Sequence, residues 1–280
     1  MSVKIIIDST TDVNPKIRDE ITIVPLTVNF GDKEYIDGVT ITKKEFYEKL
    51  IESDVLPTTS QATPDVFAQE FEKIKNQGDS AVVITLSSNL SGTYQSAVIA
   101  AADYSDCIFV IDSATVTIGA GVLADYALRL AQSGKNAREI AQIISEEREN
   151  VCLIAMIDTL KYLKLGGRVS KSVAFAGGLL SIKPIISVKN GEISVLGKAR
   201  GHKQANNLLS AEINATGGVD FSRPILLGYS GLCDVVLKQY IEDSAKLWNK
   251  NDQPLNYTDI GIVIGTHVGP GAIATAFFKR

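Results

Sequence analysis

Short apolar runs alternate with amphipathic stretches over the first 150 residues of the chain. Continuous apolar runs at 3–7, 81–85 and 107–111 are typical of strands buried in a parallel sheet. Each run is followed by a stretch with apolar residues at helical spacing. Alternation of this kind predicts a three-layer α/β unit with a mainly parallel sheet. The helices predicted in this half are 42–53, 65–77, 117–132 and 137–150.

The pattern changes after residue 150. Asn190-Gly191 stands between two apolar runs and predicts a hairpin. The other strands predicted here are 151–157, 224–229 and 261–264, and the helices are 159–165, 203–214 and 234–249. Because the pattern changes there, we expect two α/β domains, residues 1–150 and 151–280. No repeat or low-complexity linker marks the boundary between them.

Three local signals refine the first half. Pro25 interrupts the alternating run 21–30, and a proline confines such a strand to an edge or a junction. Thr42 followed by Glu45 is a capping-box pattern, which predicts the start of a helix. Residues 57–64 are rich in hydroxyls and predict a loop.

A polar loop follows the apolar run at 81–85. Residues 86–96 hold five Ser or Thr hydroxyls and Gly92, with no Asp, Glu, Lys or Arg. In open α/β sheets, ligands gather at the carboxyl ends of strands, where helix N-termini offer free N–H groups. The loop therefore favours a small anion held by hydrogen bonds over metal binding or phosphate transfer.

Composition excludes several classes of protein. The 280 residues are 45% hydrophobic and 21% charged with a net charge of −4, so no broad basic surface favours nucleic acid. The first apolar run is too short for a signal-peptide core or a membrane-spanning helix. Cys107, Cys152 and Cys233 are odd in number and predict reduced core thiols. We expect a cytoplasmic protein without an integral membrane segment.

The hydroxyl loops have two interpretations that need no bound anion. Ser91 or Thr93 is suited to cap the helix that follows, as is Thr63 for the next one. Alternatively, Ser91 is the nucleophile of a hydrolase acting on a small acyl ester, with His267 as base and Asp8 orienting it. No Gly-x-Ser-x-Gly elbow surrounds the serine.

Two further interpretations involve a ligand. Nucleotide binding lacks both the dinucleotide and the P-loop glycine patterns, and the glycine pair in Gly166–Ser170 more commonly ends a helix. The other is a carrier for an amphiphilic anion, with hydroxyls for the head and an apolar tunnel for the tail. Residues 172–182, rich in small side chains, are candidates for that tunnel. The residues alone leave all four interpretations open.

Five motifs in order give the chain a resemblance that covers almost all of it. They are Asp8-Ser9-Thr10, Pro57-Thr58-Thr59-Ser60-Gln61, residues 86–96 with Ser91-Gly92-Thr93-Tyr94, Gly166-Gly167-Arg168-Val169-Ser170, and the loop at His267. Together they resemble the DegV family. Ala62 departs from the pattern, because the family usually has proline at this position.

The resemblance implies a non-catalytic carrier of a long-chain fatty acid, without metal or cofactor. It implies that the ATP-binding subunit of a separate fatty acid kinase phosphorylates the carried carboxyl group. Carried over by motif, Thr59 and Ser91 bind the carboxylate. Arg168 and His267 lie near it or at the surface that meets the kinase. The ligand lies in the cleft between two α/β domains.

Overall fold

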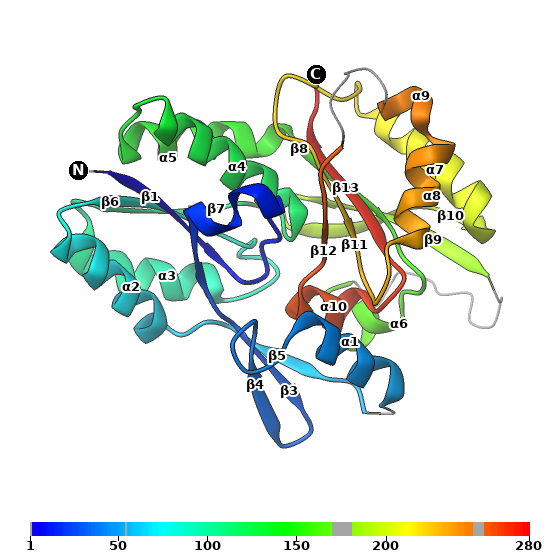
Figure 1. Cartoon of the computed structure of the whole chain (residues 1–280), viewed down its shortest axis with the longest axis horizontal. Helices are drawn as coiled ribbons and strands as arrows, with labels where there is room; N and C mark the ends of the chain where they lie inside the picture. Colours follow the sequence, from blue (N-terminus) through cyan, green and yellow to red (C-terminus); the bar gives the residue numbers. More distant parts are fainter. Residues whose placement is uncertain (1, 54, 170–180, 249–254) are drawn as a thin grey trace.

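Two β-sheets form the two sides of the molecule, with helices on their faces and between them (Figure 1). The structure is a computed structural model and describes residues 2–53, 55–169, 181–248 and 255–280. The N-terminus lies at the outer end of the first sheet, and the C-terminus lies beside the second.

The first sheet is wholly parallel, with strand order β2-β1-β6-β7. All six residues of β6 are buried, which explains its uninterrupted apolar sequence. Helices α2 and α3 cover one face, and α4 and α5 cover the other (Figure 1). The predicted three-layer unit is therefore confirmed. The bounds are β1 (Val3–Asp8), β2 (Ile21–Val24), β6 (Ser80–Thr85), β7 (Ile108–Asp112), α2 (Pro64–Asn76), α3 (Thr93–Ala101), α4 (Ile118–Gln132) and α5 (Ala137–Glu147).

The second sheet has six strands in the order β10-β9-β8-β13-β11-β12, and only β11 and β12 run parallel. The predicted hairpin is β9–β10, with Asn190 and Gly191 at its tip, both with positive φ. The strands are β8 (Val151–Met156), β9 (Ile182–Lys189), β10 (Glu192–Arg200), β11 (Leu226–Tyr229), β12 (Tyr257–Asp259) and β13 (Ile273–Phe278). Its helices are α7 (Gly201–Ala215), α8 (Val235–Asp243) and α9 (Ala245–Trp248).

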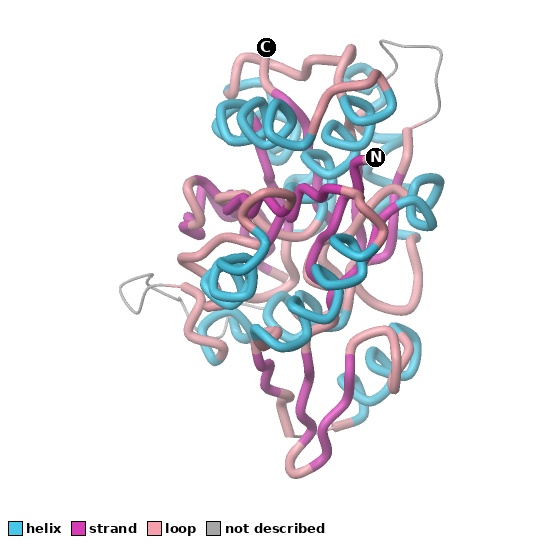
Figure 2. The backbone as a smooth tube through the Cα atoms, turned by 90° about the vertical axis from the view of Figure 1, so that its left-hand side faces the viewer, coloured by secondary structure: helices cyan, strands magenta, loops and turns pink. Residues whose placement is uncertain are grey.

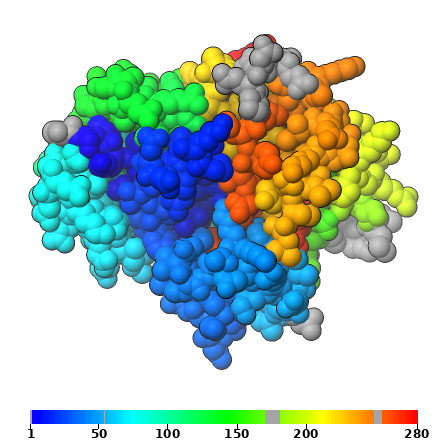
Figure 3. Space-filling view, viewed as in Figure 1, coloured from blue at the N-terminus to red at the C-terminus, as the bar shows by residue number. Residues whose placement is uncertain are grey.

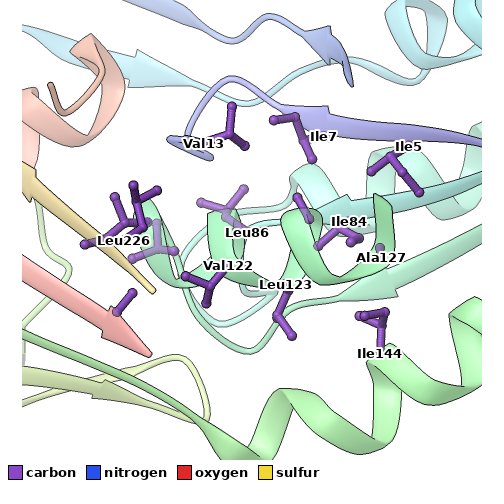
Figure 4. Close-up of a cluster of buried hydrophobic side chains, with 14 of the residues drawn as sticks. Ile5, Ile7, Val13, Ile84, Leu86, Val122, Leu123, Ala127, Ile144 and Leu226 are labelled. Carbon is purple, nitrogen blue, oxygen red and sulfur yellow. The ribbon is translucent and has the colours of Figure 1, made fainter. Parts of the chain in front are cut away.

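Helix α4 joins the two sheets, because it contacts β1 and β6 on one side and β8, β11 and β13 on the other. Figure 4 shows Leu226 of β11 in the same apolar cluster as Val122 of α4 and Leu86, the residue after β6. Figure 3 shows the blue early residues meeting the orange late residues across the molecule. One continuous core therefore fixes the two halves against each other.

A small antiparallel sheet, β4-β3-β5, projects from the body beside α1 (Figures 1 and 2). Pro25 lies between β2 and β3, so the predicted strand junction is confirmed. The expected loop at 57–64 is wrong in part, because Thr58–Ser60 forms β5 by pairing with β3. The capping box of Thr42 and Glu45 is present at α1. The bounds are β3 (Thr27–Phe30), β4 (Lys33–Ile36), β5 (Thr58–Ser60) and α1 (Lys43–Glu52).

The predicted strand at 261–264 is wrong, because these residues begin helix α10 (Ile262–Val268). Its first five residues are all buried, so the sequence lacks the polar face that identifies a helix. The last strand is β13 instead. The remaining elements are α6 (Lys161–Leu165) and the 3₁₀ turns η1 (Pro15–Glu20), η2 (Ala102–Tyr104) and η3 (Arg148–Asn150).

Strands β1 to β7 precede residue 150 and β8 to β13 follow it. Helix α10 belongs to the second half of the chain but packs against α1, β3 and β5 of the first half. The division into domains at 1–150 and 151–280 therefore remains our proposal. In the described part of the chain, no helix is long and apolar enough to cross a membrane.

Candidate ligand-binding site

A cavity of about 380 Å³ lies between the two halves of the molecule, within the range of small-molecule sites. Thr59, Ser91, Arg168 and His267, the four residues selected from the sequence, all line it. The rest of the lining is Gly92, Ser60, Gln61 and nine aliphatic residues: Leu26, Leu86, Leu90, Val116, Leu163, Ile193, Val263, Ile264 and Val268. The predicted tunnel residues 172–180 lie outside the described residues.

The exposed residues of the lining are polar or glycine, and its buried residues are aliphatic. Ser60, Gln61 and Gly92 are exposed. Several of the aliphatic lining residues are buried, among them Leu86 and Leu163, at 4% and 1% exposure. Such a gradient suits a molecule with one charged or polar end and a hydrocarbon body.

Thr59 and His267 meet across the cavity, although 208 positions separate them. Strand β5 presents Thr59 and helix α10 presents His267, and the Thr59 hydroxyl lies 3.0 Å from His267 Nε2. Gly166 fits closely on the other side of the ring, because a Cβ there would lie 2.3 Å from Nδ1. Nδ1 is buried without a hydrogen-bond partner in the described part of the chain.

His267 is neutral at physiological pH. Burial lowers the pKa of its imidazole to about 4, and the positive charge of Arg168 acts in the same direction. The Arg168 guanidinium donates to the Gly166 carbonyl at 2.6 Å and, from Nε, to the Leu90 carbonyl at 3.4 Å. Of the described lining residues, Arg168 alone is an ordinarily charged type. The site therefore combines one fixed cation with neutral donors.

Ser91 ends the polar loop after β6. Its Oγ lies 2.9 Å from Thr93 Oγ1 and accepts a hydrogen bond from the Thr93 backbone N–H at 3.3 Å. The capping interpretation is wrong for Ser91 and Thr93, because the N-cap of α3 is Gly92, which has no side chain to cap the helix. It is also wrong for Thr63, whose side chain makes no cap hydrogen bond. The Ser91 side chain bonds to the first residue of α3 and lines the cavity.

The hydrolase triad is not assembled. Asp8 is fully buried, and its carboxylate accepts hydrogen bonds from the Thr10 hydroxyl at 2.6 Å and the Leu86 backbone N–H at 2.7 Å. The hydroxyl bonded to His267 belongs to Thr59, not Ser91. Asp8 thus connects the two strand-end loops instead of orienting a base. Among the described residues, no cluster of His, Cys, Asp and Glu could hold a metal ion.

Sequence reasoning missed Gln61 and the aliphatic wall. The Gln61 amide donates to Ser96 Oγ at 3.0 Å and lies over Gly92, where a Cβ would be 2.1 Å from Oε1. Gln61 therefore ties the β5 loop to the Ser91 loop. Only its position next to Thr59 and Ser60 in the sequence could have indicated that Gln61 belongs to the site. The wall residues come from segments scattered over the chain and carried no signal.

The fold and the cavity define a two-sheet α/β protein with an amphiphilic pocket between its halves. Residues 2–280 match the model of the family described as "Uncharacterised protein, DegV family". A DegV domain-containing protein of Caldanaerobacter subterraneus is 36% identical over 284 residues, covering 99% of both chains. The chain belongs to the DegV family.

Two solved structures share the fold over their whole length. A DegV family protein from Thermus thermophilus, described by its fatty acid binding, has a TM-score of 0.88 and 27% identity, covering 100% of both chains. A stearic acid-binding protein from Eubacterium ventriosum has a TM-score of 0.85 and 30% identity, covering 100% of this chain and 99% of its own.

We expect the His267 imidazole to titrate near pH 4 in the ligand-free protein and at higher pH when a fatty acid carboxylate lies near Thr59, the hydrogen-bond partner of His267. The anion offsets the positive charge that disfavours protonation. NMR of the imidazole resonances measures both values. The chain has two histidines, so His202→Gln assigns the signals. A free-protein pKa of 6 or above would contradict the described burial.

The same shift sets the sign of a stability effect. An unfolded histidine has a pKa of about 6.5, so between pH 6.5 and 4 the unfolded chain binds more protons at this position than the folded chain. The contribution of neutral His267 to stability is therefore lost as pH falls through that window.

Proposed function

We propose that this protein binds a long-chain fatty acid, with the tail among the aliphatic wall residues and the carboxylate near Thr59 and Ser91. One observation carries the proposal. A single cavity brings together both hydroxyls, Arg168, His267 and nine aliphatic side chains from both halves of the chain. Fatty acid binding by the two proteins of similar structure described above supports it.

The energetics divide the work between tail and head. Burying each methylene contributes about 0.8 kcal/mol, so a tail of about sixteen carbons contributes about 12 kcal/mol before costs. Association costs about 4–15 kcal/mol. A hydrogen bond to a charged group adds only about 1.5–3 kcal/mol. The tail therefore supplies the affinity, and Thr59 and Ser91 determine where the carboxylate lies.

We further propose that the protein presents this carboxylate to the ATP-binding subunit of a separate fatty acid kinase, which forms the acyl phosphate. The exposed lining residues Ser60, Gln61 and Gly92 support this, because a head group beside them would be within reach of a second protein. Hydroxyl donors hold a carboxylate without the bidentate arginine pair that would cover both of its oxygens. In this scheme the carrier is cytoplasmic and is not itself catalytic.

Mass spectrometry of organic extracts from the purified protein tests the carrier function. We expect a co-purified fatty acid in roughly stoichiometric amount. A hydrolase would instead turn over acyl esters, and Ser91→Ala would abolish that turnover. An empty protein that neither binds fatty acid nor cleaves esters would contradict both functions.

Arg168→Gln is expected to slow kinase-coupled acyl phosphate formation by at least tenfold while changing fatty acid retention by less than about threefold. Two backbone carbonyls fix the guanidinium in the cavity wall, whereas the proposed tail lies among the aliphatic residues. Lys164→Gln on neighbouring α6, which is exposed and does not line the cavity, is the matched control. Equal loss of turnover and retention would count against a role in transfer or docking.

A further inference from the structure

Asp12 is a buried carboxylate that lies outside the cavity but bonds to two segments of its wall. It follows β1 and is 5% exposed. One oxygen, Oδ2, accepts a hydrogen bond from Thr117 Oγ1 at 2.7 Å, and the other, Oδ1, accepts from the Gly261 backbone N–H at 2.8 Å. The two donors are 144 residues apart in the sequence. One side chain thus ties together three distant parts of the chain.

Both donors are helix N-cap residues that lie next to the cavity wall in the sequence. Gly261 precedes α10, which contributes Val263, Ile264 and His267 to the lining. Thr117 precedes α4 and directly follows Val116, another lining residue. A displacement of either N-terminus would move part of the cavity wall.

The backbone at Thr117 needs this anchor. Its φ is 50° and its ψ is −131°, a conformation that is strained for a β-branched residue. Such strain persists only where surrounding contacts enforce it. The hydrogen bond from the Thr117 hydroxyl to Asp12 is the side-chain contact that the structure places there.

Lys43 holds the same junction from α1. Its Nζ lies 3.4 Å from Asp12 Oδ1 and donates to the Asp259 carbonyl oxygen at 2.5 Å and to its carboxylate at 2.8 Å. The Tyr47 hydroxyl donates to the Ile260 carbonyl at 3.0 Å. Burial raises the pKa of Asp12, while Lys43 and the two hydrogen bonds oppose that rise. Residues 259–261, which precede α10, are therefore held by Asp12 and by two side chains of α1.

Helices α4 and α10 each approach a neighbouring segment closely at one glycine. A Cβ at Gly121 of α4 would lie 2.0 Å from the Asp12 carbonyl oxygen, and one at Gly265 of α10 would lie 2.6 Å from the Tyr47 hydroxyl. Both helices therefore contact their supports through backbone. If the Asp12 hydrogen bonds are lost, we expect any shift of the backbone at this junction to move the two helices, because no flexible side chain lies between them and their neighbours at these glycines.

We propose that Asp12 is a positioning residue for the fatty-acid cavity: its two oxygens fix the N-termini of α4 and α10, and so the places of Val116 and His267. This inference rests on the proposed function for its ligand. It concerns a residue that does not line the cavity.

The test measures palmitate affinity, the His267 titration by NMR and the urea unfolding midpoint in three variants. Asp12→Ala is expected to weaken palmitate binding at least tenfold and to move the His267 pKa upward, as α10 loosens and the ring gains water. Asp12→Asn keeps an acceptor for Gly261 and a partner for Thr117, and should restore affinity to within about threefold. Asn206→Ala is the control for a loss of stability alone. Asn206 is a buried residue of α7 whose side chain donates a hydrogen bond to Asp243.

If Asp12→Ala lowers the unfolding midpoint as Asn206→Ala does but keeps wild-type affinity and His267 titration, the positioning role is wrong. If Asp12→Ala does not fold, Thr117→Val removes one arm with the side-chain shape kept, and Thr117→Ser retains the hydroxyl. We expect Thr117→Val to weaken binding and Thr117→Ser to preserve it, and equal affinities would overturn the inference. A wild-type protein that binds no palmitate refutes the proposed function, while the His267 titration still tests the anchor.

Discussion

Ile193→Asp is expected to weaken fatty acid binding by at least a hundredfold. Ile193 is a half-buried residue of β10 that lines the cavity. An aspartate there would put an ionised group against the hydrocarbon tail, and the effective cost of desolvating an unpaired ion is several kcal/mol. The variant should still fold, because the position is not fully buried. Titration with a fluorescent fatty acid measures the loss.

Val195→Asp is the matched control, since Val195 is also half-buried, lies two residues along the same strand and does not line the cavity. Residues two apart on a strand face the same side, so the two changes introduce the same charge on the same surface. We expect near wild-type affinity in Val195→Asp. Equal losses in the two variants would show that the tail does not lie along Ile193.

Ser91→Ala is expected to weaken fatty acid binding by about tenfold to a hundredfold. A hydrogen bond from a hydroxyl to a charged group contributes about 1.5–3 kcal/mol, and each 1.4 kcal/mol is tenfold in affinity. The methyl ester of the same acid has no charged head, so its affinity should change by less than threefold. The comparison of acid and ester isolates the contribution of the head group.

Ser88→Ala serves as the control in the same loop, because Ser88 is exposed, bonds Asp112 and does not line the cavity. It should leave both affinities unchanged. If Ser91→Ala leaves acyl binding and kinase-coupled acyl phosphate formation both unchanged, the assignment of Ser91 to the head group is wrong.

The sequence predicted the elements marked by a longer apolar run or a capping motif, and it failed where a short apolar run fits two kinds of element. The wholly buried β6 was evident from its apolar run, and α1 from its capping box. Helix α10 was missed because its first five residues are all buried. An apolar run of four residues fits a strand and a buried helix equally well.

The site was predictable only as separate polar loops. Ser91, Thr59 and His267 were visible as polar residues in loops, but their ligand-binding roles, and that of Arg168, came from the family resemblance. The Thr59–His267 contact joins residues 208 positions apart, and no spacing rule connects them. Asp12 was even less visible, because an acid after a strand carries no sign of the two helix ends it bonds.

The most direct measurement of the central claim is a crystal structure of the protein with palmitate. The proposed function predicts a tail enclosed by the aliphatic wall between the two sheets and a carboxylate oxygen within hydrogen-bond distance of Thr59 Oγ1 and Ser91 Oγ. A palmitate bound elsewhere, or one that lies in this cavity with its carboxylate at the far end from both hydroxyls, would contradict it.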